Sequence, residues 1–343
     1  MKPTRILLTI IGVVAILTLF QLPYLNRKVG LFNNQKLIEG SYEMNDSYLP
    51  SEVILFNLFE NHPDSLRNWV TTLDQKNPKL LVFDYFLESS DSLQKIELAT
   101  HFILPMTIED DSTTFSENPF SGNFSYGVIN FSNNIRFDSW IKDKDGTSYP
   151  ALATAIVTKA WNSDIEKFKD RLIKWSPRTK NTYIHDFNTF SKEQYDDEFT
   201  DKIVLLGYFG DDVSWPEPMP SEWVDVHETP IGKIFGPITV LNAYNTLRTG
   251  VPNEYSLPIN FLISVIVGFL GFYGITRIRT RNWALMILYT QIIVFAGLVL
   301  SFLTIYYLAA IGHFLNIELI SISILVCWET SLILGLKTMS NKH

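Results

Sequence analysis

Apolar residues gather in four long stretches of the chain, one near its start and three in succession near its end. They cover residues 6–22, 257–275, 283–307 and 315–336. The second and third stretches contain no Asp, Glu, Lys or Arg, and each is close to the roughly 20 residues that a helix needs to cross a bilayer core. The pattern predicts four transmembrane helices: an anchor within residues 1–22 and three helices within residues 257–336, followed by a short tail over 337–343.

Basic residues flank these helices on one side of the expected membrane. They precede the first helix, fill the turn between the second and third, and follow the fourth: Lys2, Arg5, Arg277, Arg279, Arg281, Lys337 and Lys342. The turn over residues 308–314 contains no Lys or Arg. Because basic residues in short loops stay in the cytoplasm, we expect both termini inside and residues 23–256 outside. Residues 21–26 offer no small-x-small cleavage site, so we expect the first stretch to remain as an anchor.

Between the first and second apolar stretches, short β-branched or aromatic runs alternate with helical patterns. Strands are predicted over residues 53–58, 80–85, 102–105 and 202–207, and helices over 64–75, 89–99 and 237–248, with a further helix beginning at Pro150. Residues 127–131 and 135–141 are predicted to pair as a hairpin. The alternation favours βαβ units, so the expected fold is an α/β periplasmic domain with a mainly parallel mixed sheet, in addition to four transmembrane α-helices.

Charge divides along the same boundaries. Of the 28 Lys and Arg residues 7 fall on the cytoplasmic side, and of the 36 Asp and Glu residues 2 fall in the last predicted helix, which leaves 21 basic and 34 acidic residues in the outer domain. Its net charge of −13 repels nucleic acid and anionic lipid head groups. The only cysteine, Cys327, excludes an internal disulfide, so the outer domain depends on its own core.

Several strings of the outer domain occur in the order and spacing of a known family. They are Leu80 to Glu88, Arg136 followed by Tyr149 to Ala153, Lys202 to Gly207, Thr229 to Gly232, and Asn242 to Leu247. With one span before them and three after, they make the chain resemble the second type of CHASE domain. Members are extracytoplasmic sensory domains of bacterial cyclases and kinases, so the resemblance implies an α/β fold, a bacterial inner membrane and ligand sensing.

The chain departs from that family pattern at three places. His62-Pro63-Asp64 stands where many members carry a Trp-Pro-Trp-Pro-Arg-like motif. Ile238 and Val240 occupy positions where the resemblance implies acidic and histidine residues. No cyclase or kinase sequence follows Leu336, so we expect any output to pass through partner subunits.

Acidic residues follow two predicted strands at their carboxyl ends. The candidate ligand-binding residues are Asp84, Glu88, Asp91, Asp211 and Asp212. Open α/β sheets bind ligands where parallel strands end, and carboxylates at that edge suit a cation or an amine. Helix capping and solvated loops are the alternative roles for these residues.

Two further features indicate contacts with other proteins. The aromatic, Pro-rich segment from Trp215 to Trp223 is a candidate partner surface, or else packs over the edge of the domain. Glu318 and Glu329 lie 11 residues apart and therefore on one face of the last predicted helix. For Glu329 we keep three roles open: hydrogen bonding between helices, recognition of a partner, and handling of protons or ions.

The sequence offers no motif for catalysis, for a metal or for a cofactor. Asp225, His227 and Glu228 supply too few ligands for a metal site, and we expect a surface loop there. We therefore expect a non-enzymatic inner-membrane sensor or signal-relay protein whose outer domain binds a ligand or a protein. A constitutive scaffold or accessory subunit of a cell-envelope complex is the main alternative, and an ion- or proton-coupled subunit would rest on Glu329 alone. Expected partners are other membrane or envelope proteins and the lipid bilayer, not nucleic acid, with homo-oligomerisation left open.

Overall fold

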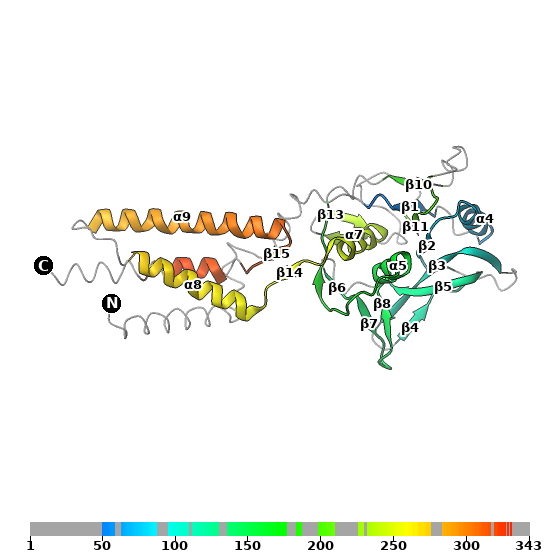
Figure 1. Cartoon of the computed structure of the whole chain (residues 1–343), viewed down its shortest axis with the longest axis horizontal. Coiled ribbons are helices and arrows are strands. Elements are labelled where there is room, and N and C mark those ends of the chain that lie inside the picture. The colour runs from blue at the N-terminus through cyan, green and yellow to red at the C-terminus, as the bar shows by residue number, and fades with distance from the viewer. Residues whose placement is uncertain are drawn as a thin grey trace. The chain divides into compact units, whose positions relative to one another are not determined.

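The computed structural model describes residues 50–58, 63–87, 95–109, 112–129, 136–176, 183–186, 198–209, 226–229, 232–275, 283–316, 319–326, 328 and 330. They belong to two compact units, and the boundary along the chain falls between Pro252 and Asn253. The first unit is an α/β domain and the second consists mainly of long apolar helices (Figure 1). The predicted anchor over residues 6–22 lies outside the described residues.

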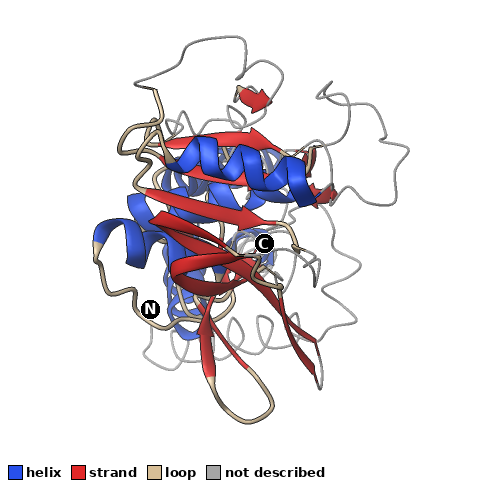
Figure 2. Ribbon diagram, turned by 90° about the vertical axis from the view of Figure 1, so that its right-hand side faces the viewer, coloured by secondary structure: helices blue, strands red, loops and turns tan. Residues whose placement is uncertain are grey.

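A mixed, mainly parallel sheet of 7 strands forms the centre of the α/β unit (Figure 2). Its strands are β1 (Val53–Asn57), β2 (Leu80–Asp84), β3 (Ile96–Glu109), β4 (Ser112–Phe115), β5 (Phe120–Val128), β10 (Ile184–Asp186) and β11 (Ile203–Gly207). The order is β10-β1-β11-β2-β3-β4, and β5 pairs with the other edge of β3. Only β4 runs antiparallel to its neighbour. The predicted sheet type is therefore confirmed, and β11 is central, as its continuous apolar run indicates.

Helices cover both faces of this sheet. On one face, Leu66 and Val70 of α4 (Pro63–Asp74) join Phe56, Phe83 and Leu206 in a single core. The other face carries α5 (Leu152–Trp161) and α7 (Gly236–Thr249). The close contacts of Gly127 with Leu152 and of Gly207 with Pro237 place these helices there, because alternate residues of a strand face opposite sides.

Three short two-stranded pairs complete the described part of the α/β unit. They are β6 (Arg136–Phe137) with β9 (Arg171–Leu172), β7 (Trp140–Lys142) with β8 (Ser148–Pro150), and β12 (Val226–Thr229) with β13 (Gly232–Phe235). The predicted hairpin of residues 127–131 with 135–141 is wrong, because β5 pairs in parallel with β3 and β6 pairs with β9. Helix α5 begins at Leu152, with Ala151 as its N-cap, so Pro150 belongs to β8 and does not start the helix.

The predicted helix over residues 89–99 is also wrong at its carboxyl end. Strand β3 already begins at Ile96, and residues 88–94 lie outside the described part. Glu97 and Ala99 favour helices on their own. In the folded chain, however, β5 supplies a neighbouring strand for Ile96 to Leu98, and this tertiary context overrides local preference.

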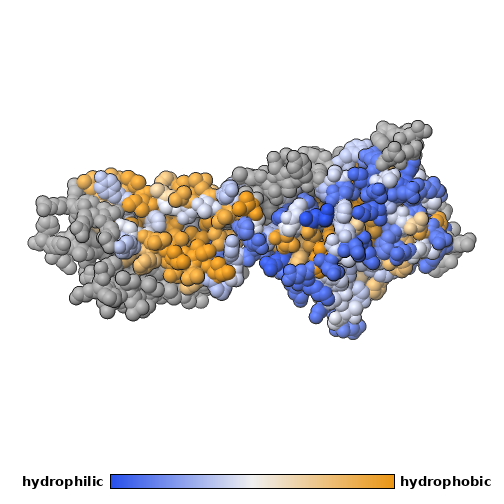
Figure 3. Space-filling model, in the orientation of Figure 1, coloured by the Kyte–Doolittle hydropathy of each residue, from blue (hydrophilic) through white to orange (hydrophobic). Residues whose placement is uncertain are grey.

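Within the described residues, the second unit contains two helices that are long and apolar enough to cross a membrane, judged by length and composition: Leu257–Ile275 and Ala284–Ala309. They correspond to α8 (Leu257–Ile275) and to most of α9 (Trp283–Ala310). The fourth predicted span is described only in part, with helix over residues 319–326. Large apolar side chains cover the outer surface of both helices, including Leu270, Phe295 and Leu300, which are 61%, 70% and 67% exposed (Figure 3).

Glycines allow the helical segment that includes residues 319–326 and 328 to pack against both long helices. The indole of Trp328 fills the space beside Gly271 of α8 and Gly297 of α9, where an added Cβ would collide with the ring. Nearby, the Ser323 hydroxyl donates to the carbonyl of Ser264 in α8. Close approach at small residues and hydrogen bonds between helices are both features of helix packing in membranes.

Candidate functional site

The carboxyl edge of the sheet is where the sequence analysis places a ligand. Strands β1, β11 and β2 end in step, because Gly207 pairs with both Asn57 and Asp84. Asp84 therefore stands at the predicted edge, where its side chain is partly buried. The other four candidates, Glu88, Asp91, Asp211 and Asp212, lie outside the described residues.

Two contacts fix the backbone at this edge. The buried Asn57 accepts a hydrogen bond through Oδ1 from the amide of Phe209 at 2.9 Å, which holds the chain as it leaves β11. Pro237, in the first turn of α7, lies where a side chain at position 207 would have to be. Gly207 is therefore required for α7 to approach the end of β11. Gly207 ends a predicted strand, but no sequence pattern marks Asn57 as a site residue, because its role depends on a partner 152 residues away.

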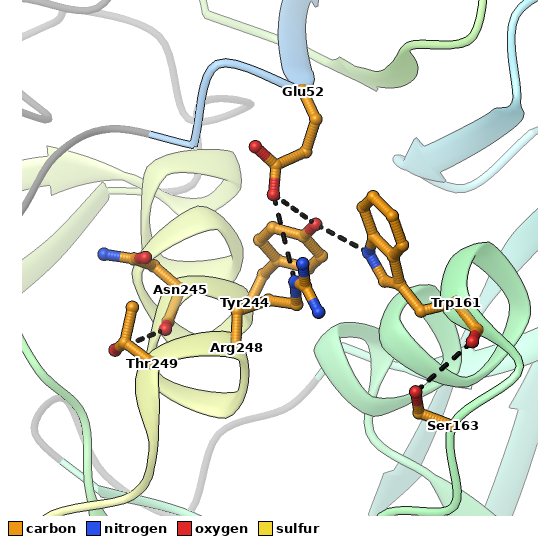
Figure 4. Close-up of polar contacts among 7 residues, drawn as sticks. All are labelled: Glu52, Trp161, Ser163, Tyr244, Asn245, Arg248 and Thr249. Atoms are coloured by element: carbon orange, nitrogen blue, oxygen red, sulfur yellow. Dashed lines mark hydrogen bonds and ion pairs between the residues drawn. The ribbon is translucent and has the colours of Figure 1, made fainter.

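A polar cluster that the sequence analysis did not anticipate lies at the opposite, amino edge of the sheet (Figure 4). We call it the Tyr244 cluster; it consists of Glu52, Lys79, Trp161, Tyr244 and Arg248. The Trp161 indole N–H donates to the Tyr244 hydroxyl at 3.0 Å, and that hydroxyl donates to Glu52 Oε1 at 3.0 Å. Glu52 precedes β1, Trp161 ends α5, and Tyr244 lies in α7, so the cluster joins the sheet to two helices.

Cations add to the same cluster. Arg248 places its guanidinium carbon 4.2 Å from the Trp161 ring centroid and its Nε 3.9 Å from Glu52 Oε1. Lys79 Nζ lies 3.6 Å from the centroid of the same ring. Both residues are exposed, so each contact contributes on the order of 1 kcal/mol or less.

The chemistry of Tyr244 is structural. Its side chain is 1% exposed, and burial, reinforced by the nearby Glu52 carboxylate, raises the pKa of the Tyr244 hydroxyl well above its usual value near 10. A hydroxyl that stays neutral cannot act as a base or nucleophile near neutral pH. It serves instead as a hydrogen-bond bridge between α5, α7 and the start of β1.

Another face of α7 binds the extended segment over residues 172–176. Thr246 Oγ1 accepts a hydrogen bond from the amide of Lys174 at 2.7 Å, and Asn242 Oδ1 accepts one from the amide of Ser176 at 3.0 Å. The Lys174 ammonium donates to the carbonyl of Thr249 at 3.3 Å, at the end of the helix, and burial lowers its pKa. Asn242, Tyr244 and Thr246 therefore hold α7 in place.

The chain leaves α7 directly into the second unit. Gly250 to Pro252 are the only residues between α7 and β14 (Asn253–Glu254), and β14 pairs in parallel with β15 (His313–Phe314), which follows α9. Asn260, in the first turn of α8, donates to the carbonyl of Tyr255 at 2.7 Å and accepts from the amide of Asn316 at 2.8 Å. The connection from α7 to α8 is therefore hydrogen-bonded to the residues that follow α9.

The remaining candidates stay predictions. Trp215, Trp223, Glu318 and Glu329 lie outside the described residues. His227 lies in the hairpin strand β12, so the position expected in a loop belongs to a short strand. Among the described residues, no three His, Cys, Asp or Glu side chains gather closely enough to hold a metal ion. Comparison with family models, curated proteins and solved structures gives no match for this chain.

Proposed function

We propose that this protein is a non-enzymatic sensor or signal-relay protein of a bacterial inner membrane. Its α/β unit would lie in the periplasm and resemble a CHASE-type sensory domain, binding a ligand or a protein there. Four spans with both termini inside would carry the bound state to partner subunits. The two apolar helices and the mainly parallel sheet support the membrane and domain parts of this proposal.

The observation that carries the relay is the connection at the end of α7. The Tyr244 cluster and Lys174 hold the last turns of this helix, and only 3 residues, Gly250 to Pro252, separate α7 from β14. Because β14 pairs with β15, a displacement of α7 would act on α8 through the chain and on the region after α9 through hydrogen bonds. A relay requires a packed element that can adopt two discrete arrangements, and α7 is that element in this proposal.

Hydrogen exchange of the full-length protein in lipid nanodiscs tests the relay. Trp161→Ala removes the bond to Tyr244 and the ring beneath Arg248. We expect amide exchange to rise by about tenfold over residues 253–256 and 311–316, since local opening follows local stability. Leu66→Ala, a core substitution in α4, is the matched control for general destabilisation. Equal exchange over residues 311–316 in the two variants would refute the relay.

Ligand binding separates the sensor from the scaffold. Stoichiometric binding of a small molecule or cation that Asp84→Ala weakens would favour the sensor. The scaffold alternative is favoured by exposed aromatic side chains on the α/β unit, such as Phe115 and Phe124, at 42% and 40% exposure. A scaffold would retain its partner in both Asp84→Ala and Trp161→Ala, because it needs neither a ligand nor a coupled membrane unit.

A further inference from the structure

An aromatic patch lies over strands β4, β5 and β8 of the α/β unit. It consists of Phe115 of β4, Phe124 and Tyr126 of β5, and Tyr149 of β8. The rings form a continuous series: Phe124 to Tyr126 at 5.5 Å between centroids, Tyr126 to Phe115 at 4.8 Å, and Phe115 to Tyr149 at 6.0 Å. Phe115 and Phe124 are 42% and 40% exposed. Contiguous exposed aromatic rings on a folded domain are a feature of interaction surfaces.

The patch is rigid because its inner end belongs to the core. Phe124 stacks on the fully buried Phe102 at 5.5 Å, and Phe102 packs edge-on against Phe120 at 5.9 Å. Tyr126 packs against the same core cluster. Rings that are already ordered lose little entropy when a partner covers them, which is the property of interface anchors.

Acidic residues near the patch indicate which kind of partner would bind there. The 34 residues from 102 to 135 contain 4 acidic residues and no Lys, Arg or His. Two of these acidic residues, Glu109 and Glu117, are exposed and flank β4. Strands β4, β5 and β8 contain no charged residue at all. An apolar aromatic surface with carboxylates on its β4 side is complementary to a segment that carries both cations and apolar side chains.

We infer that the aromatic patch binds a basic, apolar segment of a partner protein. Arginine fits best, since its guanidinium stacks on aromatic faces and pairs with carboxylates. A second copy of this chain would bring the same acidic residues and be repelled, and so would an anionic lipid surface. This inference rests on the proposed function, because it names the kind of partner that the outer unit would receive.

Binding of a labelled peptide of alternating arginine and leucine to the full-length protein in nanodiscs tests the inference. The comparison peptide carries glutamate in place of arginine and should not bind. The double variant Phe115→Ser/Phe124→Ser should weaken binding of the arginine peptide by at least about tenfold, as for loss of anchor residues. Tyr183→Ser, at a tyrosine that is 60% exposed elsewhere on the unit, is the matched control and should leave binding unchanged.

A second pair of substitutions leaves the ring packing intact. Glu109→Gln/Glu117→Gln should weaken binding by about threefold and reduce its dependence on salt. Binding that persists unchanged in the phenylalanine variant would show general attraction to an acidic surface and overturn the inference. Absence of binding, or a fall in the mass of the solubilised protein from dimer to monomer in that variant, would also overturn it. None of these outcomes depends on the exchange experiment, so the relay and the docking surface can fail separately.

Discussion

Helices α7 and α9 reverse the usual relation between polarity and burial. Helix α7 carries Thr239, Asn242, Asn245 and Thr246, yet all four are buried. Helix α9 is almost wholly apolar, yet most of its surface is exposed, and only 17% of its most apolar 18-residue stretch is buried. Position in the fold and the expected solvent explain the difference. In α7, Asn242 and Thr246 are buried with hydrogen bonds to backbone groups, whereas the exposed apolar side chains of α9 would be stable in a bilayer.

The comparison of α7 with α9 holds only if α9 lies in a membrane. Phe295→Arg tests this condition and has the largest expected effect of the three substitutions. Phe295 is 70% exposed near the middle of α9. A charge at the centre of a span costs about 3 kcal/mol for insertion, so we expect strongly reduced amounts of protein in the membrane fraction. The measurement is immunoblotting of separated membranes. Asn68→Arg, at an exposed position of α4, should leave that amount unchanged.

Asn242→Leu tests whether polar burial in α7 is structural. The substitution removes the acceptor of the Ser176 amide and leaves that group buried. We expect the free energy of unfolding of the α/β unit to fall by about 1–3 kcal/mol, measured by denaturant titration with tryptophan fluorescence. Asn68→Leu should change it by no more than about 0.5 kcal/mol. Equal stability of the two variants would mean that the Asn242 contact adds nothing to the fold.

Tyr244→Phe has the smallest expected effect and a distinct pH signature. It removes one donor and one acceptor from the Tyr244 cluster and should cost about 1–2 kcal/mol in the free energy of unfolding at neutral pH. Because burial raises the pKa of Tyr244 in the folded state, the contribution of its hydroxyl is complete below pH about 10 and is lost as pH rises further. The variant should therefore lose stability less steeply than the wild type above that pH, by denaturant titration. Parallel curves would show that Tyr244 does not titrate with a raised pKa.

The sequence predicts elements whose environment is uniform along their length. Strands β2 and β11 are buried on both faces and appear as continuous apolar runs, and α8 appears as a charge-free stretch. The start of β3 was missed because its partner β5 lies beyond the next strand in the sequence. The prediction therefore followed the local preference of these residues for helix. Asp84 ends β2 as predicted, because strand ends follow directly from continuous apolar runs, while its role as a ligand-binding residue stays a prediction. The Tyr244 cluster was missed because Glu52 and Tyr244 are 192 residues apart, and no local pattern relates them.

Topology in living bacterial cells tests the central claim, that an extracytoplasmic α/β unit is tied to a multi-pass membrane unit. Reporter fusions at Asn26 and Leu308 should be active in the periplasm, and fusions at Arg279 and His343 should be active in the cytoplasm. A fusion at Asn123, exposed in β5, should report the side on which the α/β unit itself lies and should be periplasmic. A cytoplasmic signal at Asn123 or Asn26 would contradict the account.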